Sequence, residues 1–498
     1  MLNGLRELTE RKYVHMLEGL KLREAAERFA DEVWEDLIED IAYLVEVESV
    51  EDLEKAGEEA PFGPKPAEAL ARSLEIADRL GLATHDCEHR IGYGEIKGAS
   101  DTYLATICHC DIVPLGKDWA TDPLKLARRD GYILGRGVID DKGPLVVSLY
   151  AANFFKRYVD ETGEVLPYTL RSLIGANEET NMWDVDYYLK NYEAPAFCFS
   201  PDAMFPLICG EKGLCGITVS TKPIKAADSA FVEYWAGEAF NAVPSEAYVV
   251  VRYNVQNLPE ADNIEFRKAG VDHEGRLLSM IIAHGVGGHA AFPADTVSAI
   301  KILANYLLDN HIVEGPEADF LRFECELTSD WKGTALGVDC KDDVFGDLTI
   351  IGGTVRSVFE GDMVRFEQGM DSRYPMATTA EEIEDKIGAF AANYGLEVHE
   401  SRTKKPFYIE PDSPEIEACL SSYQEVYGRT DMPVTIGGGT YARRFPRAVA
   451  FGPLDEELEM PDWVGPEHGA NEGANEEMLK KSLVIYILAL ARLMKLDF

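Results

Sequence analysis

Histidine and carboxylate side chains of the kinds that bind metal ions occur in five short segments of this chain. The segments are His109-Cys110-Asp111, Asp140-Asp141, Glu178-Glu179, Asp202 and His468. Each lies beside turn residues, where a strand or a helix is expected to end. Two histidines and several carboxylates could hold two metal ions, and one glutamate would remain to take a proton from a bridging water. The set therefore indicates a two-metal hydrolase.

The first segment is expected to end a buried strand that spans residues 103–113. Side chains alternate along a strand, so His109 and Asp111 would share one face. On that face Asp111 can accept a hydrogen bond from the second imidazole nitrogen of His109, which would fix the tautomer of a metal ligand. Cys108 and Cys110 would point the other way, into the core, because free cysteine is usually buried.

Taken singly, each segment also fits an ordinary structural role. Asp140 or Asp141 could cap the helix that is expected to begin at Gly143. A pair such as Glu178-Glu179 is usually exposed, and Asp202 could be a turn residue. Near cations, however, two neighbouring carboxylates divide naturally into a ligand and a general base. The combination of segments, rather than any one of them, carries the metal hypothesis.

The composition, with 46% hydrophobic and 27% charged residues, is typical of a folded soluble protein. The formal net charge of −40 argues against nucleic acid or an anionic membrane as a partner. Residues 1–7 are too charged for a signal peptide, and the apolar stretch 482–493 is too short to span a bilayer. Nine cysteines without C-x-x-C spacing favour free thiols in a reducing compartment. We therefore expect a cytoplasmic location.

The hydrophobic patterns predict an α/β protein with an inserted α+β segment. Strands alternate with helices in the first part, which favours a mainly parallel sheet flanked by helices. The expected strands there are 103–113, 168–175 and 196–200, and the expected helices are 20–45, 66–80, 143–158 and 185–190. From residue 212 the pattern is richer in strands, at 213–221, 246–254, 363–373 and 396–401, with helices at 296–310 and 380–394. The α/β pattern returns with helices 413–427 and 476–495 and strand 448–451.

This change of pattern predicts the domain boundaries. If Asp202 and His468 bind the same metal cluster, the first and last parts of the chain must form one domain. We expect a catalytic domain made of residues 1–211 and 405–498. Residues 212–404 would then form an inserted domain, which could lie over the site as a lid.

In their order and spacing, the segments resemble the co-catalytic metallopeptidases of family twenty, which include aminoacylases, succinyl-diaminopimelate desuccinylases and PepV-type dipeptidases. The matching runs are His109-x-Asp111, Gly135-Arg136-Gly137-x-x-Asp140-Asp141-Lys142-Gly143, Glu178-Glu179, Ser200-Pro201-Asp202 and His468. They cover essentially the whole chain.

The resemblance implies a role for each residue of the proposed centre. Asp140 would bridge two metal ions. His109 and Asp202 would complete one metal site, and Glu179 and His468 the other. Glu178 would be the general base, and Asp111 would orient His109. Oxygen and nitrogen ligands suit zinc, with manganese and cobalt as alternatives.

Further runs resemble the PepV-type dipeptidases in particular. Gly437-Gly438-Gly439-Thr440-Tyr441-Ala442-Arg443 is similar to their late glycine-rich loop, and we expect Gly439 and Thr440 to contact substrate. His468-x-x-Asn471-Glu472 is similar to their ligand motif. In the lid, Asn241 resembles a substrate-binding asparagine, and His289 resembles the histidine that polarises the scissile carbonyl, with His284 as a weaker rival. Arg373 resembles the arginine that grips the substrate carboxylate, for which a guanidinium fork is suited.

The activity that this resemblance implies is hydrolysis of dipeptides with a free C-terminal carboxylate, through a hydroxide between two metal ions. One alternative is a deacylase or carboxypeptidase that acts on N-acyl amino acids with the same centre. A more remote alternative is a metal-binding protein without catalysis, which the presence of Glu178 beside Glu179 disfavours. We expect a monomer, because the enlarged lid could supply the lid histidine within one chain.

Overall fold

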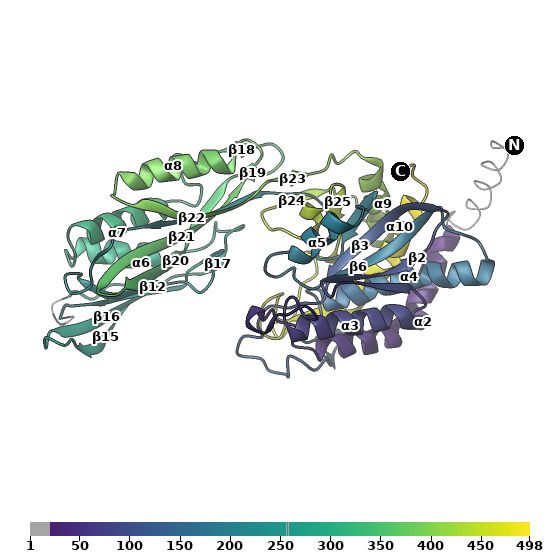
Figure 1. Ribbon diagram of the computed structural model, residues 1–498, viewed down its shortest axis with the longest axis horizontal. Coiled ribbons are helices and arrows are strands. Elements are labelled where there is room, and N and C mark those ends of the chain that lie inside the picture. Colours follow the sequence, from purple (N-terminus) through teal and green to yellow (C-terminus); the bar gives the residue numbers. More distant parts are fainter. Residues whose placement is uncertain (1–19, 255, 257) are drawn as a thin grey trace. The chain divides into compact units, whose positions relative to one another are not determined.

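The computed structural model describes residues 20–498 apart from 255 and 257 (Figure 1). It has two compact units, each with its own hydrophobic core. Unit 1 contains the chain up to Cys209 together with 408–434 and 439–498. Unit 2 contains 210–407 and 435–438. The two main crossings of the chain between units lie close to the expected boundaries at 211/212 and 404/405.

The segment Thr435–Gly438 differs from the expected division, which placed it in the catalytic domain. Its hydrogen bonds explain the difference. The amide of Lys212 donates to the carbonyl of Ile436 at 2.9 Å, and the guanidinium of Arg373 donates to the carbonyl of Gly437 at 2.9 Å. Since these partners belong to unit 2, the first part of the glycine-rich loop belongs there too.

Unit 1 is built on a mixed sheet whose central strands are parallel. Its strand order is β1-β2-β6-β3-β7-β25-β9-β23, and β24 pairs with β9. The neighbours β6, β3, β7 and β25 run parallel, whereas β1, β2 and β9 are antiparallel to their neighbours. The bounds are β1 Ala83–Cys87, β2 Ile91–Ile96, β3 Ser100–His109, β6 Tyr168–Gly175, β7 Phe197–Ser200, β9 Ile208–Glu211, β23 Phe407–Tyr408, β24 Val434–Ile436 and β25 Ala448–Ala450.

Six α-helices pack in the part of unit 1 that the structure describes. They are α2 Leu20–Val45, α3 Pro64–Arg79, α4 Lys142–Thr162, α5 Trp183–Asn191, α9 Pro414–Tyr427 and α10 Glu476–Leu493. Helix α10 packs against α2, α4 and α9, and its residues Leu483, Ile485 and Ile487 are fully buried. A helix that is apolar on all sides belongs in a core. Burial of each such side chain stabilises the fold by roughly 1.5–3 kcal/mol.

Unit 2 is an α+β unit on an antiparallel sheet. Its strand order is β15-β16-β14-β12-β20-β21-β10-β22, and β11 pairs with β21. Helix α6 packs on β14 and β16, and α8 packs on β10 and β22 (Figure 1). The bounds are β10 Gly213–Ser220, β11 Ile224–Lys225, β12 Phe231–Ala236, β14 Glu246–Val251, β15 Ile264–Val271, β16 Leu277–His284, β20 Thr349–Glu360, β21 Met363–Tyr374, β22 Glu397–Lys404, α6 Ala299–Asp309, α7 Pro316–Leu327 and α8 Ala380–Ala392.

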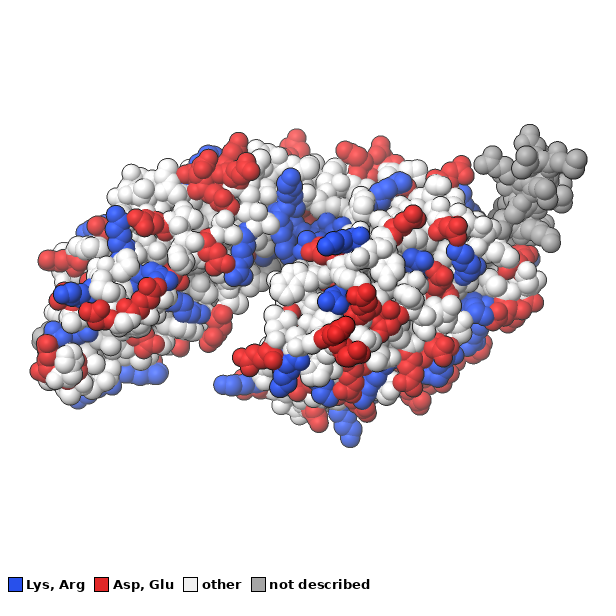
Figure 2. All heavy atoms as spheres, in the orientation of Figure 1, with Lys and Arg blue, Asp and Glu red and all other residues white. Residues whose placement is uncertain are grey.

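Shorter elements complete both units. They are β4 Ala127–Arg129, β5 Tyr132–Leu134, β8 Ala203–Met204, β13 Ala242–Val243, β17 Gly288–His289, β18 Lys341–Asp342, β19 Gly346–Asp347, β26 Pro453–Leu454, β27 Gly473–Asn475, η1 Leu53–Lys55 and η3 Tyr441–Arg444. Among the described residues, no helix combines the length and the apolar character needed to cross a membrane. Figure 2 shows acidic and basic side chains interspersed on the face in view, as is typical of a solvated surface.

The predicted α/β class with an inserted α+β unit is confirmed, but the expected strand 103–113 is too long. Strand β3 ends at His109. Beyond it, the amide of Cys110 still donates to the carbonyl of Gly175 in β6 at 2.9 Å. The next main-chain groups bond to Ser49 instead, because the Ser49 hydroxyl donates to the carbonyl of Cys110 at 2.6 Å and the amide of Ile112 donates to the carbonyl of Ser49 at 3.2 Å. The prediction also omits β12, β16, β20 and α7. Strand β20 contains two glycines, which are depleted in strands and obscure the pattern.

Candidate metal centre and active site

Three of the predicted segments follow the carboxyl ends of parallel strands in unit 1. His109 is the last residue of β3, Glu178 and Glu179 follow β6, and Asp202 follows β7. These strands are neighbours in the sheet. Because parallel strands end at one edge, their following residues gather there, where α/β proteins usually bind ligands.

The remaining two ligands lie on loops that a small sheet joins. Asp140 precedes α4, and His468 precedes β27. Strand β27 pairs with β5, with Gly473 opposite Leu134. This antiparallel pairing brings the loop of His468 to the loop of Asp140. The peptide bond between Asp140 and the next residue is cis.

The five predicted ligands converge, and Asp140 lies at their centre. Its Oδ1 is 3.0 Å from Nε2 of His109, and its Oδ2 is 2.8 Å from Nε2 of His468. Nε2 of His109 is also 3.8 Å from Oδ2 of Asp202, and Nε2 of His468 is 3.2 Å from Oε2 of Glu179. A carboxylate that presents one oxygen to each histidine is well placed to bridge two cations.

Ligand atoms from these segments form two overlapping groups. Single atoms of His109, Asp140 and Glu179 lie within 4.8 Å of one another, and so do single atoms of His109, Glu178 and Asp202. Glu178, the predicted base, therefore lies among the predicted ligands.

The buried carboxylates of this cluster fit divalent cations. Oε1 of Glu178 and Oε1 of Glu179 are buried and have no hydrogen-bond partner among the described residues. Burial, and then repulsion from neighbouring carboxylates, raises the pKa of Glu178, Glu179 and Asp202. Unpartnered buried oxygens and repelling carboxylates are costly. Two divalent ions would relieve both costs, and the oxygen and nitrogen donors suit zinc, manganese or cobalt.

Positive charge is favoured at the two histidines. Burial lowers the pKa of His109, but hydrogen bonds with Asp111 and Asp140 outweigh it, so the pKa lies well above its ordinary value. Hydrogen bonds with Asp140 and Glu179 raise the pKa of His468 to about 11. Burial works to raise the pKa of Asp140, yet its bonds with the histidines hold it below the ordinary range. The cluster thus attracts cations.

Both the carboxylate and the main-chain carbonyl of Asp111 face the imidazole of His109. Nδ1 of His109 lies 3.0 Å from the main-chain carbonyl oxygen of Asp111 and 3.4 Å from its Oδ1. The Asp111 carboxylate accepts the amides of Glu178 and Glu179, both at 3.2 Å. Asp111 therefore positions the glutamate pair as well as the histidine.

A buried ion pair that the sequence prediction did not single out joins the two loops. Arg136 and Glu472 are 1% and 0% exposed, and their side chains pair. Oε1 of Glu472 accepts the amides of Gly137 and Asp140 at 2.9 and 3.4 Å, and Arg136 donates to the carbonyl of His468 at 3.2 Å. The sequence contained one hint of this pair, because Arg136 and Glu472 carry opposite charges and each lies within one of the matched motifs.

Local contacts also constrain the residues that follow Asp140. Asp141 accepts the amide of His109 through Oδ2 at 3.0 Å, which ties the loop to the end of β3. A Cβ on Gly143 would lie 2.1 Å from the carbonyl oxygen of Val138. Only glycine therefore fits at that position of the first turn of α4.

The predicted lid residues lie in unit 2. Nδ2 of Asn241 is 3.4 Å from Nε2 of His289, and β13 pairs with β17 beside them. His284, the alternative candidate for the lid histidine, is the last residue of β16. Its Nε2 lies 3.4 Å from Oε2 of Glu265. Arg373 is buried, and two of its guanidinium nitrogens bond to Asp371 at 2.6 and 3.1 Å. Its guanidinium is thus held in a fixed orientation.

The other two predicted substrate residues, Gly439 and Thr440, lie in unit 1. The Thr440 hydroxyl accepts the amide of Ala442 at 3.1 Å and caps η3. A Cβ on Gly439 would lie 2.6 Å from the Arg443 guanidinium. The structure therefore gives Thr440 a local role in the chain.

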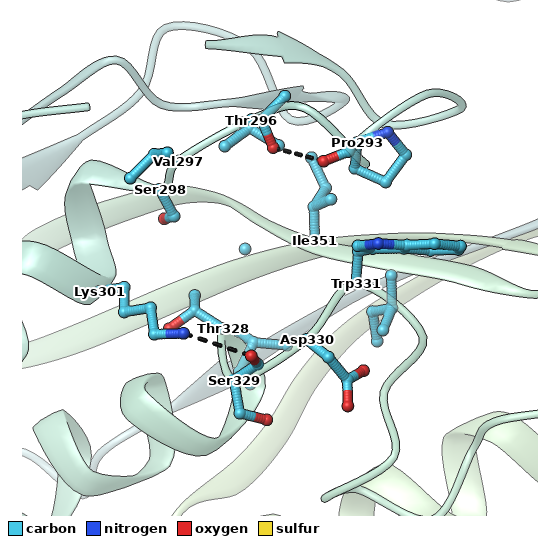
Figure 3. A pocket seen from close by; sticks show the side chains of 14 residues that line it. Pro293, Thr296, Val297, Ser298, Lys301, Thr328, Ser329, Asp330, Trp331 and Ile351 are labelled. Carbon is cyan, nitrogen blue, oxygen red and sulfur yellow. Dashed lines mark hydrogen bonds between the residues drawn. The ribbon is translucent and has the colours of Figure 1, made fainter. Parts of the chain in front are cut away.

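A separate cavity of about 240 Å³ lies in unit 2 (Figure 3). The first turn of α6, the chain after α7 and strand β20 form its walls. The predicted site residues are absent from its lining, which is Val243, Pro293, Thr296, Val297, Ser298, Lys301, Leu327, Thr328, Ser329, Asp330, Trp331, Ile350, Ile351 and Gly352.

The fold and the buried cluster define a metal-dependent hydrolase with an inserted α+β unit. The chain belongs to Peptidase family M20/M25/M40, whose family model matches residues 105–496. It is a metallopeptidase, and the family predicted from the motifs is confirmed.

Two relatives and one solved structure cover nearly the whole chain. A Staphylococcus saprophyticus protein is 32% identical over 472 residues, which are 92% of this chain and 97% of the relative. YtjP of Bacillus subtilis strain 168 is 30% identical over 471 residues, which are 93% and 98%. Both carry provisional dipeptidase names. Human carnosine dipeptidase 1 has the same fold, with a TM-score of 0.58, 13% identity, and coverage of 95% of this chain and 99% of that chain.

Proposed function

We propose that this metallopeptidase hydrolyses the amide bond of dipeptides that have a free C-terminal carboxylate. The central observation is that Asp140 presents one oxygen to each of two histidines, at 3.0 and 2.8 Å. The dipeptidase names of the two relatives support the choice of substrate.

The metal ligands in this proposal are His109, Asp140, Glu179, Asp202 and His468. Two divalent ions would be held there, with zinc as the first choice and manganese or cobalt as alternatives. When bound, such ions polarise a carbonyl and lower the pKa of water.

Glu178 is the general base in this proposal. Its Oε1 is buried and has no hydrogen-bond partner among the described residues, so it is available to a substrate water. Burial and the nearby Asp202 raise its pKa well above the ordinary value, which increases its affinity for a proton. Glu178 would take a proton from the attacking water and return it to the leaving amine.

The remaining predicted residues would hold the substrate. His289 and Asn241, whose side-chain nitrogens are 3.4 Å apart, could both donate to carbonyl or carboxylate oxygens of the substrate. Arg373, fixed by Asp371, would bind the C-terminal carboxylate. Gly439 and Thr440 would contact the substrate through their main chain, because the Thr440 hydroxyl already caps η3.

A substrate panel tests this function. Chelated protein is assayed on dipeptides, tripeptides and N-acyl amino acids, with and without added zinc, manganese or cobalt. Metal-restored cleavage of dipeptides alone is the expected result and identifies the working metal. Cleavage of N-acyl amino acids alone would replace the proposed substrate, and metal binding without any turnover would contradict the catalytic proposal.

We also propose a cytoplasmic location. The structure has nine free cysteines, seven of them buried, at positions Cys87, Cys108, Cys110, Cys198, Cys209, Cys215 and Cys419. Free thiols are typical of reducing compartments. Fractionation of cells that express the chain would test this location.

A further inference from the structure

We propose that Tyr441 and Asp184 are positioning residues that hold the turn carrying Glu178 and Glu179. The inference rests on the proposed roles of these two glutamates. Neither Tyr441 nor Asp184 is among the proposed metal ligands or substrate residues.

Four consecutive amides of this turn are held by two buried carboxylates. Oδ2 of Asp184 accepts the amides of Ala176 and Asn177 at 2.8 and 3.0 Å. The carboxylate of Asp111 accepts the next two amides, those of Glu178 and Glu179, both at 3.2 Å. Hydrogen bonds from amides to an ionised carboxylate are stronger than those between neutral groups. The hydrogen bonds to the carboxylates of Asp184 and Asp111 therefore set the position of the glutamate pair.

Tyr441 adds a further hydrogen-bond donor to this arrangement. Its hydroxyl donates to the same Oδ2 of Asp184. Tyr441 and Asp184 are both 0% exposed. The Tyr441 ring also meets the His109 ring edge-on, with centroids 6.2 Å apart. One side chain thus contacts a proposed metal ligand and supports the turn of the proposed base.

The space for the Tyr441 hydroxyl depends on Gly175, the last residue of β6. A Cβ at Gly175 would lie 2.0 Å from Oη of Tyr441 and 2.6 Å from Oδ2 of Asp184. No side chain larger than hydrogen fits there without displacing the pair. The absence of a side chain at Gly175, in the strand that leads to Glu178, therefore leaves room for the hydrogen bond between Tyr441 and Asp184.

Flanking contacts fix both partners. Tyr441 begins η3, which Thr440 caps through the amide of Ala442 at 3.1 Å. Arg444, at the end of η3, donates to the carbonyl of Asn181 at 3.0 Å. Asp184 lies in the first turn of α5. The short helix of the glycine-rich loop is thus docked on the segment that follows the glutamates.

The hydroxyl matters because Asp184 is buried. Burial raises the pKa of Asp184 to about 6, and the hydrogen bond from Tyr441 opposes that shift. Without the hydroxyl, the carboxylate would lose a donor in a site that water does not reach, and it would become a weaker acceptor for the two amides. The turn would loosen at Glu178, while four of the five proposed ligands stay on other segments.

The test compares Tyr441→Phe with Tyr234→Phe. Tyr234 is a matched control, since it is also fully buried and donates to a buried carboxylate, Glu324, at 2.7 Å in unit 2. We expect Tyr441→Phe to lower kcat at saturating metal, with little change in KM. We also expect it to weaken metal binding in competition with a chelator, and the loss in each should be roughly 10–100-fold. Tyr234→Phe should change neither quantity.

A second variant, Asp184→Asn, tests the same hydrogen bond from its other partner, so the proposal does not depend on whether one variant folds. Together with the double variant it also measures the energetic coupling between Tyr441 and Asp184. Asp184→Asn keeps the size of the side chain and removes its charge, and it should reproduce the losses of Tyr441→Phe. Because the two residues act as one unit, the double variant should lose no more than the worse single variant. Fully additive losses, or equal losses in Tyr441→Phe and Tyr234→Phe, would refute the proposal.

Failure of the proposed function would be distinguishable. If the wild type cleaves no dipeptide, the substrate proposal is wrong, but the chelator competition still compares the variants without substrate. Unchanged metal affinity and unchanged kcat in Tyr441→Phe would instead overturn the positioning role, whatever the substrate.

Discussion

At the scale of single residues, the proposed metal centre is arranged around Asp140, which lies between two histidines from distant parts of the chain. Its oxygens face His109 and His468 at 3.0 and 2.8 Å. Carboxylates of the turn after β6 and of Asp202 surround this core, and their burial raises their proton affinity. Such a cluster is expensive unless cations neutralise it.

The role of Glu178 is the first residue-level prediction. Glu178→Ala should lower kcat by roughly 10²–10⁴-fold, because proton transfer by a positioned base supplies about that factor. All five proposed ligands remain in this variant, so its metal content should be retained. Metal analysis and kinetics on the same preparation check this. Loss of metal with activity retained would show that Glu178 is a ligand and not the base.

The second residue-level prediction concerns the ion pair of Arg136 and Glu472. Glu472→Gln leaves a buried guanidinium without its counter-charge, so it should lower the free energy of unfolding by about 3–5 kcal/mol. Denaturant titration measures the change. Glu35→Gln is the control, because Glu35 pairs with Arg128 at the surface, where side-chain exposures are 72% and 41%. Equal effects of both substitutions would show that burial of the pair contributes nothing.

At the scale of elements, neighbouring parallel strands deliver the ligands to one edge, and buried acidic side chains then position the loops. Asp184 and Asp111 hold the turn after β6, Glu472 holds the loop before α4, and Asp141 holds the end of β3. Each accepts main-chain amides. The loops of the centre are therefore held by hydrogen bonds from their amides to buried carboxyl groups, at positions where secondary structure does not satisfy those amides.

Unit 2 contains a buried acid that yields a prediction about pH. Glu324 on α7 is 0% exposed, accepts the Tyr234 hydroxyl at 2.7 Å, and has a buried Oε1 without a hydrogen-bond partner among the described residues. Burial raises its pKa well above the ordinary value. Since the folded state favours the protonated form, its contribution to stability is complete below the unfolded pKa and is lost as pH rises toward the folded pKa.

Glu324→Gln should therefore increase the stability of unit 2 at neutral pH and flatten the decline in stability that begins as pH rises above about 4.3, the ordinary pKa of glutamate, toward neutral. The amide keeps the shape of the side chain and can still accept from Tyr234. Thermal unfolding across this pH range measures the effect, with the exposed neighbour Glu326→Gln as control. A wild type whose stability rises with pH in the same way as the variant would contradict the burial argument.

At the scale of the whole molecule, the proposed metal ligands and three of the predicted substrate residues belong to units with separate hydrophobic cores. The centre is built entirely from unit 1, and three predicted substrate residues belong to unit 2. We propose that one chain supplies all of them and is active as a monomer. Sedimentation velocity at assay concentrations should give a single species near the chain mass of 55.3 kDa. Activity that rises with a monomer-to-dimer transition would contradict this proposal.

The sequence by itself was enough for the class, the family and the local elements that carry strong periodicity. Helix 20–45 and strand 168–175 occur with the predicted bounds, because their apolar spacing is a local property. The family follows from short motifs that occur in the chain in the order that the family has. All five proposed ligands lie together in the structure.

Only the tertiary structure decided which groups support the centre. Asp184 is an ordinary acid in a short helix until Tyr441, from a distant loop, donates to it. Arg136 and Glu472 become a pair only when β27 meets β5. The end of β3 at His109 was likewise decided by bonds to Ser49. Such contacts join residues far apart in sequence, so local periodicity and composition carry no trace of them, whereas burial and long-range hydrogen bonds determine them.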